Sequence, residues 1–283
     1  NGVVEQTRRH AAIAALLRVP HVVLAVNKMD LAGYERAVFE RIVADFTAQT
    51  AELELPGLTA IPVSALVGDN VVDRSAHMDW YEGPALLEFL ENVPVAADAA
   101  DAPARFPVQY VIRHGDVRHY AGQLVSGSLR VGDRVTVHPS GETSEIAGID
   151  VLGTKAEAAH APQSVGIRLA DQRDVSRGDM ITTGPGAPVL TQDVTAAACH
   201  LADRPLRVGD RVLLKHATRT VKAIVRDLAG TAELTANDLG RITLRSAEPL
   251  PLDAYAVSRR TGAFILIDPA DGATLTAGMV DFG

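Results

Sequence analysis

The 283-residue sequence has a single cysteine, Cys199, so no disulfide can form within the chain, which fits a reducing cytoplasm. Its alanine-rich apolar surroundings favour a buried, inert thiol over a nucleophile. No apolar run approaches the roughly 20 residues that cross a bilayer, and no signal-peptide pattern opens the chain. Excess positive charge is lacking too, because the net charge is −8. We therefore expect a soluble cytoplasmic protein with no membrane or nucleic-acid partner.

Motifs of metal-dependent and hydrolytic enzymes are also lacking. The nine histidines form no His-Glu-x-x-His motif, and His114, Asp116 and His119 predict a polar loop rather than a metal site. Neither Ser64 nor Ser126 lies in the Gly-x-Ser-x-Gly setting of a hydrolase. We therefore assign no catalytic residue and no metal ligand.

The first part of the chain alternates between expected helices and strands. Residues 3–18 and 34–46 carry apolar side chains at helical spacing, and a third helix is expected over Gly83–Leu90. The apolar runs Val22–Val26 and Leu58–Val63 predict strands, the first of them covered on both faces of a parallel sheet. This alternation is typical of an α/β domain.

The composition changes between Pro94 and Arg105, where alanine, aspartate and proline predict a solvated linker. Beyond it, short apolar runs separated by glycine, proline and aspartate turns are typical of β-barrels. The expected strands are Phe106–Ile112, Val135–His138, Val165–Leu169, Met180–Thr183, Val194–Cys199, Arg211–Lys215, Val221–Arg226, Arg241–Leu244 and Ala263–Ile267.

One segment of the β region is repeated, since Leu129–Val135 recurs letter for letter as Leu206–Val212. Either the same Gly-Asp turn arose twice or the region was duplicated, and both alternatives stay open. Under either alternative, both halves of the β region contain a similar turn that leads into a strand. We therefore divide the region into two barrels near Leu190. The predicted domains are 1–95 for the α/β part, 96–104 for the linker, 105–190 for the first barrel and 191–283 for the second.

The residues Asn27-Lys28-Met29-Asp30 directly follow the first expected strand. Ligands of open α/β sheets collect at such strand ends. A carboxylate there can accept two parallel hydrogen bonds from the N1–H and N2 amino groups of guanine, worth roughly 1.5 to 3 kcal/mol each, and adenine lacks these donors. We expect Asn27 to contact the base edge and join neighbouring loops, and the apolar stem of Lys28 to lie along the purine.

A second loop supports this interpretation. Ser64-Ala65-Leu66 follows the second expected strand and resembles the second guanine loop of GTPases, where a backbone N–H, here that of Ala65, meets the base oxygen O6. Two such loops in this order predict a guanine-nucleotide site. Its residues are Asn27, Lys28, Asp30, Ser64, Ala65 and Leu66.

Beyond these loops, the chain resembles a translational-type GTPase, in which a nucleotide domain precedes two β-barrels as in elongation factor Tu. It resembles more closely the GTPase large subunit of bacterial sulfate adenylyltransferase (ATP sulfurylase). Arg105–Val111 favours that subunit, whereas Trp80–Glu88 is also similar to archaeal and eukaryotic elongation factors. The other segments that carry the resemblance are Glu5–His10, Ser176–Asp179, Thr261–Asp268 and Ala277–Val280.

The resemblance implies a partial P-loop GTPase domain of the α/β class followed by two all-β barrels, the elongation-factor-like domains 2 and 3. It also implies GTP with Mg²⁺ as ligands, and a heteromer with a small subunit that forms adenosine 5′-phosphosulfate and pyrophosphate from ATP and sulfate. This chain would couple GTP hydrolysis to that uphill step of sulfate assimilation through a conformational switch. A fused or associated adenylylsulfate kinase is a further partner that the family implies.

The phosphate-binding half of such a site is missing from the sequence. No Gly-Lys pair occurs, so no Gly-x-x-x-x-Gly-Lys-[Ser/Thr] loop can cradle the phosphates. Only 26 residues precede Asn27, and the Asp-x-x-Gly matches that start at Asp30, Asp150 and Asp227 all follow it. We therefore expect a portion of a longer protein that does not hydrolyse GTP alone and whose Mg²⁺ ligands lie upstream.

Three functions stay open at this stage. The first is the GTPase subunit of sulfate adenylyltransferase. The second is a translation factor that binds aminoacyl-tRNA, which needs a basic surface across the nucleotide domain and the second barrel. The third is a non-catalytic scaffold that acts through its barrels.

Overall fold

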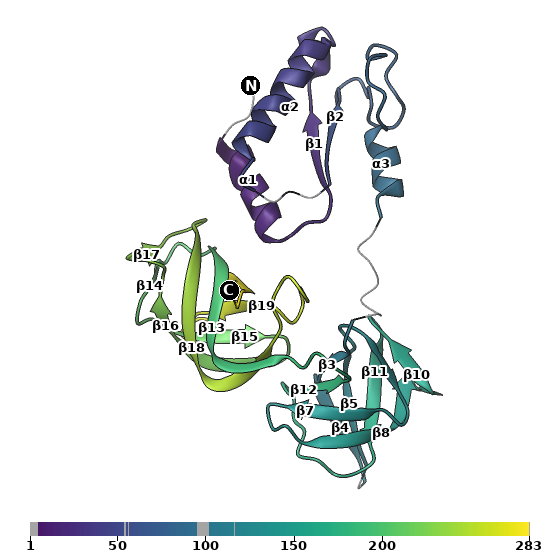
Figure 1. Cartoon of the computed structure of the whole chain (residues 1–283), viewed down its shortest axis with the longest axis vertical. Coiled ribbons are helices and arrows are strands. Elements are labelled where there is room, and N and C mark those ends of the chain that lie inside the picture. The colour runs from purple at the N-terminus through teal and green to yellow at the C-terminus, as the bar shows by residue number, and fades with distance from the viewer. Residues whose placement is uncertain (1–4, 54, 56, 95–101, 116, 283) are drawn as a thin grey trace. The chain divides into compact units, whose positions relative to one another are not determined.

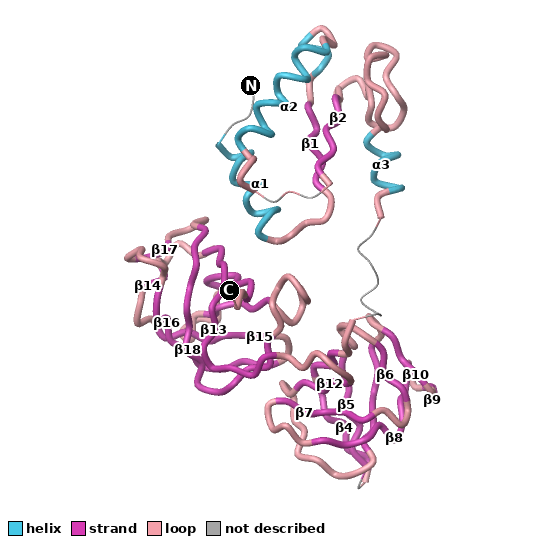
Figure 2. The backbone as a smooth tube through the Cα atoms, viewed as in Figure 1, coloured by secondary structure: helices cyan, strands magenta, loops and turns pink. Residues whose placement is uncertain are grey.

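The computed structural model describes residues 5–53, 55, 57–94, 102–115 and 117–282 (Figure 1). It divides into two compact units, Asn1–Ala97 and Asp98–Gly283, and each is described by itself. Helices and strands alternate in the first unit, whereas the second is built from strands (Figure 2). This architecture confirms the predicted fold class. The linker predicted at 96–104 lies largely outside the described residues.

The first unit holds two parallel strands and the helices around them. Its elements are α1 (Glu5–Leu16), β1 (Val22–Val26), the short 3₁₀ helix η1 (Met29–Ala32), α2 (Arg36–Gln49), β2 (Leu58–Pro62) and α3 (Leu86–Asn92). The helix expected from residue 34 starts later, because Tyr34 has a φ of 58°, outside the helical region. The helix expected from Gly83 begins only at Leu86. No helix in the described part of the chain is both long and apolar enough to cross a bilayer.

Burial in the first unit is concentrated at one end of the sheet. The prediction that β1 is covered on both faces is wrong, since only Val26 is buried and Ala25 is exposed. A sheet with two strands, as the described residues have it here, offers few neighbours to cover both faces. Val26, Met29 and Met78 form the core, against which Trp80 and other half-buried side chains pack. The best-packed region therefore lies where β1 ends.

The first barrel is a sheet in which the strands follow the order β3-β12-β7-β8-β11-β5-β4, with β9 paired to β8. A bridge between Arg105 and Ser126 joins β3 to the segment after β5. Its elements are β3 (Arg105–Pro107), β4 (Tyr110–His114), β5 (Val117–Gln123), β6 (Ser128–Arg130), β7 (Arg134–His138), β8 (Thr143–Val151), β9 (Thr154–Ala156), β10 (Ala158–His160), β11 (Ser164–Leu169) and β12 (Met180–Thr183).

Two predictions for the first barrel are wrong. The single strand expected over Phe106–Ile112 is divided into β3 and β4, because the chain changes its pairing partner from β12 to β5 between them. The polar loop expected around His114 and His119 is a hairpin, in which these residues belong to the strands β4 and β5, while Asp116 lies outside the described residues. Nδ1 of His119 lies 3.4 Å from a carboxylate oxygen of Asp150 on β8, the strand on the other side of β11.

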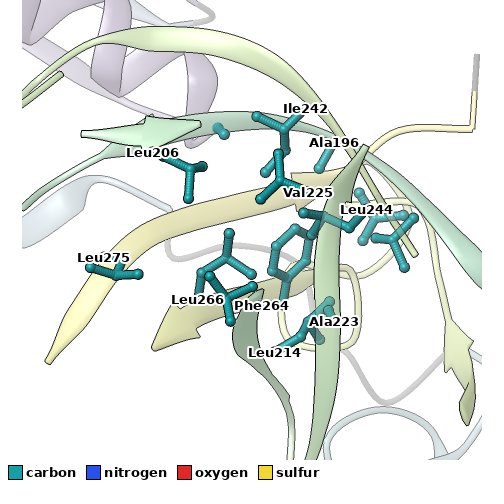
Figure 3. Close-up of a cluster of buried hydrophobic side chains, with 14 of the residues drawn as sticks. Ala196, Leu206, Leu214, Ala223, Val225, Ile242, Leu244, Phe264, Leu266 and Leu275 are labelled. Atoms are coloured by element: carbon teal, nitrogen blue, oxygen red, sulfur yellow. The ribbon is translucent and has the colours of Figure 1, made fainter. Parts of the chain in front are cut away.

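The second barrel is closed in the order β13-β18-β16-β15-β19-β20. Aliphatic side chains from all six strands fill its interior, and Phe264 lies among them (Figure 3). Cys199 is buried at the end of β13, as expected for an inert thiol, and burial raises its pKa. The elements are β13 (Val189–His200), β14 (Leu206–Arg207), β15 (Arg211–His216), β16 (Arg219–Asp227), β17 (Glu233–Leu234), β18 (Leu239–Leu252), β19 (Ala263–Ile267) and β20 (Thr274–Val280).

The repeated heptapeptide forms the same turn in both barrels. Gly132 and Gly209 both have a φ of 92°, a conformation that glycine adopts readily. The carboxylate of Asp133 accepts the Arg130 N–H at 2.7 Å, and that of Asp210 accepts the Arg207 N–H at 2.9 Å. Each turn therefore guides the chain into the outgoing strand, β7 or β15, by identical chemistry.

A buried ion pair connects the two barrels. Arg105 on β3 donates through Nε and Nη2 to the two carboxylate oxygens of Asp253, at 2.9 and 2.8 Å. The side chains are only 4% and 7% exposed. Thr261 donates a further hydrogen bond to Asp253 at 2.6 Å, and Arg105 also donates to the Gly186 carbonyl. Both charged groups therefore have hydrogen-bond partners, which a buried charge needs because it has lost its contact with water.

We predict that Arg105→Ala destabilises the second unit by about 3 to 5 kcal/mol, because it leaves the Asp253 carboxylate buried without its partner. The free energy of unfolding in urea, followed by circular dichroism, measures the effect. Arg241→Ala is the matched control: the Arg241–Asp281 pair is half-exposed on both sides, so its loss costs about 1 kcal/mol or less. Equal losses in the two variants would contradict a stabilising role for the buried pair.

A second prediction concerns His138 and His216, both buried and hydrogen-bonded to Thr182 and to the Thr261 carbonyl. Burial lowers the pKa of both below 6.5, and the charge of Arg105 lowers that of His138 further. The unfolded chain therefore binds protons more readily as pH falls below 6.5, and stability is lost in that range. The measurement is the unfolding free energy above and below pH 6.5.

Replacing both histidines by glutamine should flatten this part of the pH profile. His160→Gln is the control, because His160 is exposed and its removal should leave the slope unchanged. An unaltered slope in the double variant would show that other groups cause the pH dependence.

Candidate functional site

Two loops meet where the strands β1 and β2 end. The parallel register places Val26 opposite Pro62, so the residues that follow each strand leave the same edge of the sheet. Backbone hydrogen bonds continue beyond the strands, from the Val63 N–H to the Val26 carbonyl at 2.9 Å and from the Met29 N–H to the Val63 carbonyl at 3.2 Å. The predicted site residues are thereby brought together in space.

Asn27 joins the two loops through one atom. Its Oδ1 accepts the Lys28 N–H at 2.7 Å and the Ala65 N–H at 3.0 Å. Lys28 itself has a φ of 67°, in the left-handed region. Because this oxygen already accepts two hydrogen bonds, the part of the Asn27 side chain that is left for a ligand is its NH₂ group, which can donate.

Asp30 is held in place by Ser64. The serine hydroxyl, which is fully buried, donates to Oδ1 of Asp30 at 2.7 Å. Asp30 itself is half-buried, so its carboxylate retains contact with solvent. A hydrogen bond of this kind fixes the rotation of a carboxylate, which is what recognition of two parallel N–H donors needs.

Ala65 and Leu66 complete the set of predicted residues. The Ala65 N–H donates to Asn27, so an acceptor on a bound base has to share this donor or replace the asparagine oxygen. Leu66 is 89% exposed, and Lys28 at the other loop is also exposed. An apolar side chain and a long aliphatic stem thus stand uncovered at the edge where the two loops meet.

Sequence reasoning missed a supporting group around Asp69. Its carboxylate accepts the hydroxyl of Tyr34 at 3.0 Å and that of Ser75 at 2.7 Å, and its backbone pairs with Ser64. The indole N–H of Trp80 donates to the Tyr34 carbonyl at 3.0 Å. Desolvation, followed by the hydrogen bond to Asp69, raises the pKa of Tyr34. This group fixes the loop that carries Ser64, and no periodicity in the sequence points to it.

The described residues contain no group of three or more histidine, cysteine, aspartate or glutamate side chains placed to hold a metal ion. The geometry of the two loops can instead bind a planar heterocycle. It offers carboxylate and carboxamide groups for the edge of the ring, and the uncovered side chains of Lys28 and Leu66 for its faces.

Two known protein families match parts of the chain. Residues 1–98 match the family described as the elongation factor Tu GTP binding domain, and residues 193–281 match the family described as GTP-eEF1A C-terminal domain-like. A solved structure of sup35 complexed with GDP has a TM-score of 0.60 at 22% identity, covering 97% of this chain and 72% of that one. That likeness establishes the fold.

Several curated proteins are similar over almost the whole chain. The bifunctional enzyme CysN/CysC of Mycobacterium tuberculosis is 46% identical, and sulfate adenylyltransferase subunit 1 of Bacteroides fragilis is 38% identical, each over 99% of this chain. The chain spans 48% of the first relative and 61% of the second. These similarities confirm the resemblance seen in the sequence: over almost its whole length the chain is similar to sulfate adenylyltransferase subunit 1 proteins, and its first part matches the GTP binding domain of elongation factor Tu.

Proposed function

We propose that this chain contributes the guanine-recognition part and the two barrels of a GTP-binding subunit of sulfate adenylyltransferase. In the intact protein, GTP hydrolysis would drive the formation of adenosine 5′-phosphosulfate and pyrophosphate from ATP and sulfate by a small adenylyl-transferring subunit. The observation that carries the proposal is the set of hydrogen bonds linking Asn27 to Ala65 and Asp30 to Ser64. The relatives named sulfate adenylyltransferase subunit 1 support the choice of reaction.

Each site residue has a chemical role in this proposal. The Asp30 carboxylate accepts the N1–H and N2 amino hydrogens of guanine, and the Asn27 NH₂ group donates to acceptors on the base edge. The aliphatic stem of Lys28 and the side chain of Leu66 cover the faces of the ring. Ser64 orients the carboxylate, and the Ala65 N–H lies within reach of O6. Mg²⁺ and the phosphates are assigned to residues other than these six.

The remaining expectations belong to the same proposal. They are the division into 1–95, 105–190 and 191–283, a heteromeric assembly in the cytoplasm, and an adenylylsulfate kinase as a fused or associated partner. The similarity to a protein named CysN/CysC supports the last of these. A translation factor is less well supported, because the sulfate-related relatives share 36–46% identity, whereas the sup35 structures share 22–23%.

The test of the reaction is reconstitution of the full-length protein with the small subunit. We expect pyrophosphate release from ATP and sulfate to rise when GTP is supplied. The alternative assay, binding of aminoacyl-tRNA, should be negative. Tight aminoacyl-tRNA binding without any effect of GTP on sulfate activation would replace the proposal by the translation-factor function.

In that protein, Asp30→Asn should exchange guanine for xanthine specificity. The substitution replaces one carboxylate acceptor by an NH₂ donor, which opposes the amino group of guanine and suits the carbonyl that xanthine carries at the same position. By analogy with other unpaired polar groups, we expect about a 10⁴-fold loss of GTP affinity. Asp45→Asn, an exposed position on α2, is the control. Unchanged GTP affinity in Asp30→Asn would remove Asp30 from the site.

Ser64→Ala tests the positioning of the carboxylate. Removing one hydrogen bond to a charged group should weaken guanine-nucleotide binding roughly tenfold to a hundredfold without creating affinity for xanthine. Nucleotide titration by fluorescence measures both. Thr47→Ala is the control, because its hydroxyl donates to the Val43 carbonyl within α2 and does not touch Asp30. If the two variants bind the nucleotide alike, the Ser64–Asp30 contact has no special role.

A further inference from the structure

The outer face of the second barrel carries an unusual set of side chains along β15 and β16. Successive residues of a strand point alternately inward and outward, and in β15 Val212, Leu214 and His216 are buried. The outward residues of the two strands include four exposed cations around two half-buried aliphatic side chains. We call this set the cationic face: Arg211, Lys215, Lys222 and Arg226, with Leu213 and Ile224 between them.

The cationic face contains a shallow pocket of about 530 Å³. Its apolar lining includes Leu213, Ile224 and Pro269, and its charged lining is Arg211, Lys222 and Arg245. Strand pairing explains this mixture, since Arg211 lies opposite Ile224 and Leu213 lies opposite Lys222. An apolar floor is thereby surrounded by positive charge.

Most of these charges are not neutralised within the chain. Arg245, at the edge of the pocket, binds Asp193. For Arg211, Lys215, Lys222 and Arg226, no carboxylate of the described residues lies within 4.0 Å of the charged nitrogens. This concentration of unpaired cations stands out in a chain whose net charge is −8.

The first barrel shows that the turn and strands do not require such a face. In its copy of the repeated segment, Arg134 takes the place of Arg211, and it lies opposite Glu145 instead of an isoleucine. The next outward pair is Thr136 and Thr143, where the second barrel has Leu213 and Lys222. The same backbone thus has a charge-matched polar surface in one barrel and a cationic, partly apolar one in the other.

We propose that the cationic face binds an acidic segment of a partner protein, which places an apolar side chain in the pocket and carboxylates against the rim. Charge complementarity selects an acidic partner, because the free cations repel a basic one. The apolar floor distinguishes a polypeptide with mixed side chains from a simple anion. The face has no aromatic residue on which bases could stack, so single-stranded nucleic acid is a poor match. This interaction is independent of the proposed reaction.

A fluorescein-labelled peptide that alternates glutamate and leucine is the probe, and fluorescence anisotropy with the full chain measures its binding. We expect Arg211→Glu/Lys222→Glu to weaken binding at least about tenfold, because two attractions become repulsions. Arg134→Glu is the matched control, with the same local sequence in the other barrel, and should bind like the unmodified chain. Added salt should weaken binding by the unmodified chain.

Additional measurements distinguish an acidic, partly apolar partner from other ligands. A peptide of glutamine and leucine, or one of glutamate and glutamine, should bind more weakly, and equal binding of either would overturn the proposal. So would absence of peptide binding, equal weakening by Arg134→Glu, or tighter binding of a single-stranded oligothymidylate. A dimer in light scattering that the double variant dissociates would assign the face to a second copy instead. Arg211→Gln/Lys222→Gln repeats the test without introducing new charge, and circular dichroism checks the fold of each variant.

Discussion

The arrangement of the candidate site depends on one acceptor atom, the side-chain oxygen of Asn27. This oxygen binds an N–H group in its own loop and the N–H of Ala65 in the other. The shared edge of the parallel strands, where both loops leave the sheet, makes the second contact possible. Once Ala65 is fixed, the neighbouring Ser64 is within reach of Asp30. The position of the carboxylate therefore follows from an asparagine three residues before it.

The second unit depends on a different kind of contact. Two barrels, each with its own apolar core, are joined by the buried pair of Arg105 and Asp253. A buried ion pair contributes to a specific arrangement only when its remaining donors and acceptors are satisfied. Thr261 and the Gly186 carbonyl meet that condition here. The Arg219–Asp179 ion pair also joins the two barrels, so their docking rests on polar complementarity at more than one contact, while each core is stabilised by hydrophobic burial.

Local patterns in the sequence predict some of this structure and miss the rest for physical reasons. The apolar runs that end in Asn27 and Ser64 predict both strands and both loops, because parallel strands end at the same edge. Nothing local predicts the partnership of Arg105 with Asp253, which lies 148 residues away. The network around Asp69 is hidden for another reason: it belongs to an irregular loop, where no periodicity links a side chain to its neighbours.

The repeated heptapeptide shows which of its positions are needed for folding and which contribute only to the surface of each barrel. In both barrels its leucine is buried and its aspartate closes the turn, so these positions serve folding. Its second arginine points outward in both, and its surroundings differ, since Glu145 lies opposite it in one barrel and Ile224 in the other. Outward positions are free of the packing that constrains the interior. A difference confined to them, with the turn kept letter for letter, is therefore a difference in what each barrel presents to other molecules.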